Sequence, residues 1–160
     1  MSLSQKIVAE VDDLVKTCAP PLCISAEEGP YKIDLPVSLA TSIGIECEGF
    51  DFHVLDRLEI SIDDLKMWGE RLSARLTYLM EPLSILEADS VAGEVLLRSQ
   101  STTPRNDRRS YYEVRLNKTG LMRFDRITFD ETTRTRQKTS CQFTIEVLER
   151  LVDDLVAMAA

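Results

Sequence analysis

The chain has 160 residues, of which 29% are charged and 44% hydrophobic, and 27 acidic against 19 basic residues give a net charge of −8. This length and composition are typical of one globular domain, which needs no metal or disulfide to complete its core. No apolar run reaches the roughly 18 residues of a membrane span, and the first residues lack the basic start and apolar core of a signal peptide. We therefore expect a cytoplasmic protein that forms a single domain over residues 1–160.

Residues with catalytic or ligand-binding chemistry are few. Cys18, Cys23, Cys47 and Cys141 are dispersed, and His53 is the only histidine. Zinc sites need clustered ligands, and dispersed cysteines in a reducing compartment are usually small buried hydrophobic residues. We favour that interpretation over a Cys18–Cys23 disulfide. Because glycine-rich phosphate loops and a nucleophile beside a base are also missing, the sequence favours a non-catalytic domain over an enzyme, with no metal and no cofactor.

The N-terminal residues 1–20 predict a helix, because their apolar residues recur at helical spacing. Ser4 is the expected N-cap, and the prolines at positions 20 and 21 are expected to end the helix.

Residues 22–60 predict a first group of strands. Around Pro36 the alternation suggests an edge strand, because proline cannot donate to a central ladder. A second strand is expected near Ile45. Strong alternation then runs from Phe50 to Ile60 and is interrupted at Asp56, where we expect a bulge that turns the carboxylate to water.

Residues 61–81 predict a central helix capped by Ser61 and ended by Pro82. Its expected buried stripe consists of Leu65, Trp68, Leu72, Leu76 and Leu79.

Residues 83–142 predict a β-meander of short strands, with a bulge near Arg126 where the apolar parity changes. Residues 144–160 predict a C-terminal helix with an apolar stripe wide enough for core packing or for a two-fold homodimer interface. Each expected helix carries an Asp-Asp pair, as in Asp153-Asp154, which helical periodicity assigns to its water-facing side. The predicted fold is α+β, with a single mostly antiparallel sheet, its strands in two groups, and the N-terminal, central and C-terminal helices on one face.

Charge is uneven along the chain. Residues 98–141 hold 11 Lys or Arg and 5 Asp or Glu, a net charge of +6 in an otherwise acidic protein. Alternation places many of these cations on one solvent-facing side of the sheet, beside an arginine-rich loop. The candidates for binding an anion or a partner are Arg98, Arg105, Arg108, Arg109, Arg115, Arg123, Arg134, Arg136 and Lys138.

Two interpretations of this basic face compete. It is either an anion-binding surface or a solvated face of cross-strand ion pairs, with Glu113 and Asp125 against the arginines. We favour the ion pairs, because the whole domain is acidic and only Tyr111 offers a stacking aromatic ring there. Nucleic acid is therefore the least favoured partner.

The order of expected elements resembles that of the secretion chaperones, a class of small dimeric α+β proteins, and this resemblance implies a homodimer that binds other proteins. Residues 43–160 are also similar to the helix-grip ligand-binding fold. That likeness implies a pocket for a small molecule or an enzymatic site, lined by Phe50, Phe52, Trp68, Met122 and Phe124, although core packing is the favoured role of these residues. We expect a binding or adaptor domain, homodimeric, acting through protein–protein contact, with the helix-grip and anion-binding interpretations as alternatives.

Overall fold

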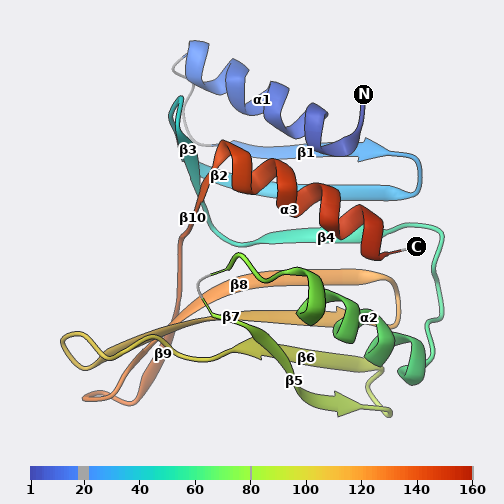
Figure 1. Cartoon of the computed structure of the whole chain (residues 1–160), viewed down its shortest axis with the longest axis vertical. Coiled ribbons are helices and arrows are strands. Elements are labelled where there is room, and N and C mark those ends of the chain that lie inside the picture. The colour runs from blue at the N-terminus through green and yellow to red at the C-terminus, as the bar shows by residue number, and fades with distance from the viewer. Residues whose placement is uncertain (18–21, 80, 160) are drawn as a thin grey trace.

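The computed structural model describes residues 1–17, 22–79 and 81–159. Over these residues the chain forms a 10-stranded, mostly antiparallel sheet with three helices over one face (Figure 1). This arrangement confirms the predicted α+β class. The predicted end of the first helix at the two prolines and the pairing of Cys18 lie outside the described residues.

The strands follow each other mainly as antiparallel neighbours. Their bounds are β1 (Leu22–Glu28), β2 (Tyr31–Ala40), β3 (Gly44–Cys47), β4 (Phe50–Val54), β5 (Leu83–Asp89), β6 (Glu94–Ser99), β7 (Arg108–Asn117), β8 (Leu121–Asp130), β9 (Thr135–Thr139) and β10 (Cys141–Thr144). The order across the sheet is β10-β3-β2-β4-β8-β7-β6-β5, with β1 added to β2 and β9 added to β8. The predicted meander is therefore present from β5 to β9.

Two junctions turn the sheet. β3 continues into β4 through Gly49, which has a φ of +70°, and β9 continues into β10 through Ser140. β3 pairs with β10, whereas β4 pairs with β8. The β3–β10 pair consequently runs across the direction of the other strands at one end of the molecule (Figure 1).

The three helices are α1 (Leu3–Thr17), α2 (Ile62–Arg75) and α3 (Ile145–Met158). Ser61 caps α2, with its hydroxyl accepting from the N–H of Asp64, and Thr144 caps α3 in the same way. The first helix is capped two residues earlier than predicted: Ser2 Oγ accepts from the Gln5 N–H at 3.3 Å, and Ser4 lies inside the helix.

One hydrophobic core joins the helices to the inner face of the sheet. The rings of Phe50 and Phe124 stack across β4 and β8 with centroids 4.8 Å apart. Phe52 and Met122, which the helix-grip resemblance would place around a pocket, are likewise fully buried in this core.

The apolar stripe of α3 is occupied within the same chain. Leu148, Leu151, Val152, Leu155 and Met158 are all buried in the core. The stripe therefore serves core packing, and any contact between two copies must use a different surface.

Several local predictions were wrong for identifiable reasons. β2 is an interior strand, not an edge, because Pro36 faces the bend after β3, where its carbonyl accepts from the Glu48 N–H at 3.0 Å. β4 ends at Val54, so Asp56 lies exposed in a turn and not in a bulge, and α2 ends at Arg75, before the predicted limit of 81.

The predicted bulge near Arg126 is also wrong. β7 and β8 pair without any shift of register from residue 108 to residue 130. Arg126 instead turns to the inner face, with its guanidinium 5.0 Å from the Tyr112 ring centroid. Ile127 faces outward together with Tyr111, and both are nevertheless buried.

Candidate functional site

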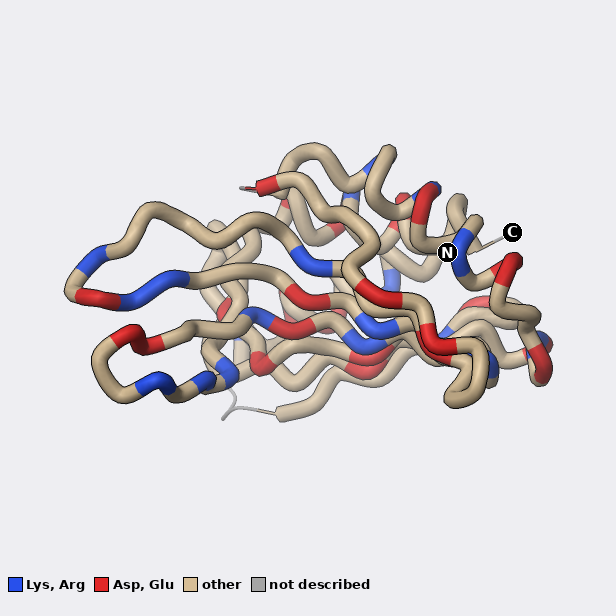
Figure 2. The backbone as a smooth tube through the Cα atoms, turned by 90° about the horizontal axis from the view of Figure 1, so that it is seen from below, with Lys and Arg blue, Asp and Glu red and all other residues tan. Residues whose placement is uncertain are grey.

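The predicted basic face exists, but its cations are paired with acids on the same strands. Figure 2 shows basic and acidic positions interleaved on neighbouring strands of the sheet. Arg98 and Glu113 are direct cross-strand partners on β6 and β7, and Arg115 and Arg123 are partners on β7 and β8. Period-two alternation brings these side chains to the face opposite the helices, as the sequence predicts.

Glu113 is the centre of one ion-pair network. Its carboxylate accepts from Arg136 Nη2 at 2.6 Å and from Arg115 Nη2 at 2.8 Å, and Arg98 Nη2 lies 3.7 Å away. The Glu113 side chain is only 5% exposed, whereas those of Arg115 and Arg136 are about half exposed. The guanidinium of Arg98 also lies 4.8 Å from the Tyr111 ring centroid. Three cations therefore cover one buried carboxylate and an aromatic ring.

Asp125 is the centre of a second network. Its carboxylate accepts from Arg123 Nη2 at 2.9 Å and lies 3.6 Å from Lys138 Nζ. Arg123 also reaches Asp51 Oδ1 at 3.4 Å and donates to the Glu48 carbonyl at 3.0 Å. Burial opposes the charge of Arg123, but its contacts with Asp125 and Asp51 outweigh this and raise its pKa. The Arg123 guanidinium is therefore stabilised in its charged form by these acids.

The other candidates lie outside these networks. Arg134 is in the turn before β9, with a φ of +59°, so it is not on the predicted face. Arg108 and Arg109, near the start of β7, lie 3.8 Å from Asp130 and 2.6 Å from Glu131, respectively. Arg105 lies in the preceding loop, where its backbone bridges to Arg108.

A shallow groove of about 390 Å³ runs between the two networks. Its charged lining is Arg115, Arg123, Arg136 and Lys138 with Glu113 and Asp125. Because each of these cations already lies beside one of the acids, an arriving anion would compete with existing ion pairs. The geometry therefore favours the interpretation of this face as a set of cross-strand ion pairs over that of an anion-binding surface.

A second surface, at the β3–β10 end of the sheet, is apolar and open. A groove of about 470 Å³ there is lined by Leu39, Thr41 and residues 43–46 and 142–144. Two of the lining side chains are large, apolar and exposed: Ile43 is 76% exposed and Leu39 is 56% exposed. β10 is the last strand in the sheet order, so its outer edge has no neighbour among the described strands.

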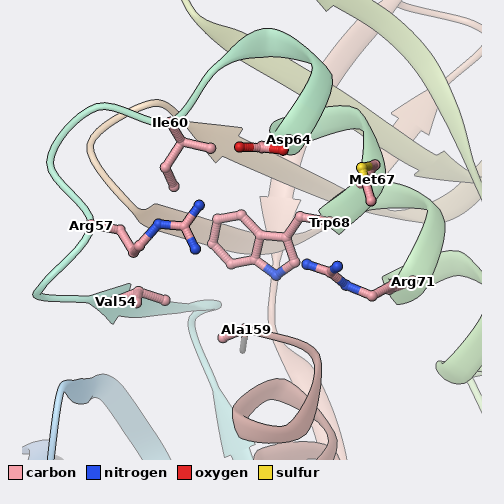
Figure 3. A pocket seen from close by; sticks show the side chains of 8 residues that line it. All are labelled: Val54, Arg57, Ile60, Asp64, Met67, Trp68, Arg71 and Ala159. Carbon is pink, nitrogen blue, oxygen red and sulfur yellow. The ribbon is translucent and has the colours of Figure 1, made fainter.

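A third surface is a small pocket between the β4–α2 loop, one side of α2 and the end of α3 (Figure 3). Its volume is about 240 Å³. Trp68 and Arg71 are three residues apart on α2, which places them side by side on the helix. The loop is tied to the β7–β8 turn, since Ile60 N–H donates to the Lys118 carbonyl at 2.9 Å. Arg57, from the same loop, also lines the pocket.

Sequence reasoning missed one buried acid. Asp154, assigned to the water-facing side of its helix, is only 7% exposed. It accepts from Arg75 Nε at 2.8 Å and from the Tyr78 hydroxyl at 2.7 Å, which joins α3 to the last residue of α2 and to the segment that follows it. Burial, and then this hydrogen bond to Asp154, raise the pKa of Tyr78 above its ordinary value near 10. Only Asp153 of the pair faces water.

The three cysteines of the described residues and the histidine line neither of the two grooves nor the pocket described above, and two of the cysteines lie side by side. Cys47 and Cys141 are buried cross-strand partners on β3 and β10, whereas Cys23 is exposed, contrary to the prediction of burial. His53 Nε2 lies 3.2 Å from the Thr119 carbonyl. No group of three or more potential metal ligands occurs in the described part of the chain.

None of the described helices is long and apolar enough to cross a membrane. Comparison of the chain with protein-family models, with curated proteins and with solved structures found no match. The function must therefore be argued from the three surfaces.

Proposed function

We propose that the protein is a non-catalytic cytoplasmic binding domain that acts through protein–protein contact and works as a homodimer. The observation that carries the proposal is the apolar groove at the β3–β10 end, where Leu39 and Ile43 are exposed beside an open sheet edge. Exposed apolar groups and unpaired backbone groups at one place are what an added protein segment would cover.

The direction of backbone groups at this edge supports binding of an extended strand. Ile145 N–H donates to the Ile43 carbonyl at 3.0 Å, toward β3. Because the backbone groups of an antiparallel strand alternate in direction, those of Phe143, two residues earlier, also point toward β3. Gln142, the residue before Phe143, then directs its N–H and C=O away from β3. A partner strand can pair with this residue while its side chains enter the apolar groove.

A second copy of the same chain is the partner that this edge fits most directly. Two short β10 edges related by a two-fold axis run antiparallel and present the same groups to each other. The same contact would bury Ile43 of both copies. The α3 stripe is not needed for this dimer, in agreement with its burial in the core.

The test is the oligomeric state of the full chain, measured by sedimentation velocity between about 1 and 100 µM, a range in which weak dimers with micromolar dissociation constants form. We expect a dimer for the native protein and a monomer for Ile43→Asp, because an uncompensated carboxylate would enter the apolar contact. Val91→Asp is the matched control, since Val91 is 92% exposed on a turn between β5 and β6. It should leave the dimer intact.

A native protein that stays monomeric throughout this range would contradict the homodimer. The same three proteins, immobilised and exposed to cytoplasmic extract, test for a different protein partner. Proteins retained by the native chain and by Val91→Asp but lost with Ile43→Asp would support docking at the groove. If the Ile43→Asp variant keeps every contact of the native chain, the proposed surface is wrong.

A further inference from the structure

The indole N–H of Trp68 is buried and has no hydrogen-bond partner in the described structure. Trp68 itself is only 4% exposed. A buried donor without a partner costs free energy, and most such donors in native proteins are satisfied. Figure 3 shows the indole nitrogen on the edge of the ring that faces Arg71 and Ala159, within the pocket between α2 and α3.

Two guanidinium groups accompany this donor. Arg57 and Arg71 line the pocket on either side of the indole (Figure 3). Neither takes part in any ion pair among the described residues, although 11 such pairs are present elsewhere. The pocket thus combines three donors, two of them charged: the indole N–H is buried and unpaired, and the two arginines are exposed to solvent and form no ion pair with any described residue. An oxyanion supplies the acceptors that this arrangement needs.

The charges and the size of the pocket narrow the class of ligand. Asp64 also lines it, so two positive charges and one negative charge leave a balance that suits a monoanion better than a dianion. The remaining walls, from residues such as Val54 and Met67, are apolar. The volume of about 240 Å³ is below the roughly 300–1,000 Å³ typical of drug-sized ligands, so the ligand is small.

We infer that this pocket binds a small organic carboxylate, held by Arg57, Arg71 and the Trp68 indole N–H, with its apolar part against Val54 and Met67. The two arginines bind the carboxylate oxygens, and the indole donates a further hydrogen bond to the same group. The site is separate from the β3–β10 groove and does not depend on the proposed protein contact.

The protein provides its own probe of this site, because Trp68 is its only tryptophan. Its indole N–H gives a single tryptophan side-chain cross-peak in an ¹H–¹⁵N NMR spectrum. We propose titrating the full chain with phenylacetate, with the neutral amide phenylacetamide and with inorganic phosphate, at constant ionic strength. Phenylacetate should move this cross-peak in a saturable manner, while the amide and phosphate should not.

Arg57→Gln and Arg71→Gln test the role of the two cations. Each should weaken phenylacetate binding at least about tenfold, since each removes one charge-assisted contact. Lys66→Gln is the matched control, because Lys66 is an exposed cation on the same helix outside the pocket lining. It should leave the dissociation constant unchanged.

Three results would overturn the inference. The first is an indole cross-peak that phenylacetate does not move at up to about 10 mM, a concentration that would reveal even millimolar affinity. The second is binding of phenylacetamide as tight as that of phenylacetate. The third is the same loss of phenylacetate affinity in Arg57→Gln, Arg71→Gln and Lys66→Gln. Tighter binding of inorganic phosphate than of phenylacetate would overturn the assignment to a carboxylate.

Discussion

Glu113 provides the sharpest test of how the basic face is built. Replacing it with Gln keeps the shape of the side chain but removes the charge that holds Arg115 and Arg136 at 2.8 and 2.6 Å. A hydrogen bond to a charged group contributes about 1.5–3 kcal/mol. Both arginines are about half exposed, so hydration of their guanidinium groups offsets much of this free energy when the carboxylate is lost. We therefore expect a loss of about 2 kcal/mol in the free energy of unfolding, below the roughly 3 kcal/mol that two such contacts would contribute at the lower end of this range.

For a chain of this size, that loss corresponds to a fall in Tm of about 4–8 °C. The assay is urea unfolding followed by circular dichroism, with calorimetry for Tm. Glu131→Gln is the matched control, because Glu131 forms an equally short contact with Arg109, 2.6 Å, and its side chain is 36% exposed, against 5% for Glu113. An exposed pair is worth about 0–1 kcal/mol. If the two variants lose the same stability, the buried carboxylate does not organise the arginines and the reasoning is wrong.

Three further predictions follow from other contacts. Gly49→Ala should lower the free energy of unfolding by about 2–4 kcal/mol, because the φ of Gly49 is +70° and the new Cβ would lie 2.5 Å from Asp125 Oδ1. Gly29→Ala, with a similar φ and open space around the new Cβ, should lower it by only about 1–2 kcal/mol. Equal losses in urea unfolding would exclude the close approach to Asp125 as a cause. The raised pKa of Tyr78 means that the unfolded chain loses this proton first as pH rises, so stability should fall above about pH 10. Tyr78→Phe should make this fall above about pH 10 shallower; an unchanged slope would contradict this linkage. Binding of a single-stranded DNA 20-mer should be absent at micromolar protein and low salt, because the cations of the basic face are already paired; salt-sensitive binding that is lost when Arg115, Arg123 and Arg136 become Gln would revive the anion-binding interpretation.

The sequence was sufficient for the elements whose side-chain period is strong. Period-two alternation located β6, β7 and β8, and Ser61 marked the start of α2 through ordinary capping chemistry. The alternation gave the wrong side of the sheet for Ile127, which is buried on the outer face and was expected on the inner face. The arginine-covered cluster with Tyr111 explains this failure, because long arginine side chains can shield apolar groups without any layer of helices.

Residues that meet from distant parts of the chain were the ones missed. Asp154 lies 79 residues from Arg75 and 76 from Tyr78, so helical periodicity alone could only assign it to water. The pocket at Trp68 combines a loop, one side of α2 and the end of α3. The spacing of Trp68 and Arg71 was visible in the sequence, but neither the unpaired indole N–H nor the nearness of Arg57 could be predicted without the tertiary structure.

The three surfaces differ in how far their groups are already satisfied, and this difference orders them as binding sites. On the basic face almost every cation has an acid beside it, although Arg98 Nε has no hydrogen-bond partner. A ligand there must break ion pairs before it forms new ones, which leaves little net gain. The β3–β10 groove and the Trp68 pocket present exposed apolar groups, an open strand edge or unpaired donors. A ligand gains most where such groups are unsatisfied, so binding is expected at these two surfaces, although the highest density of charge lies elsewhere.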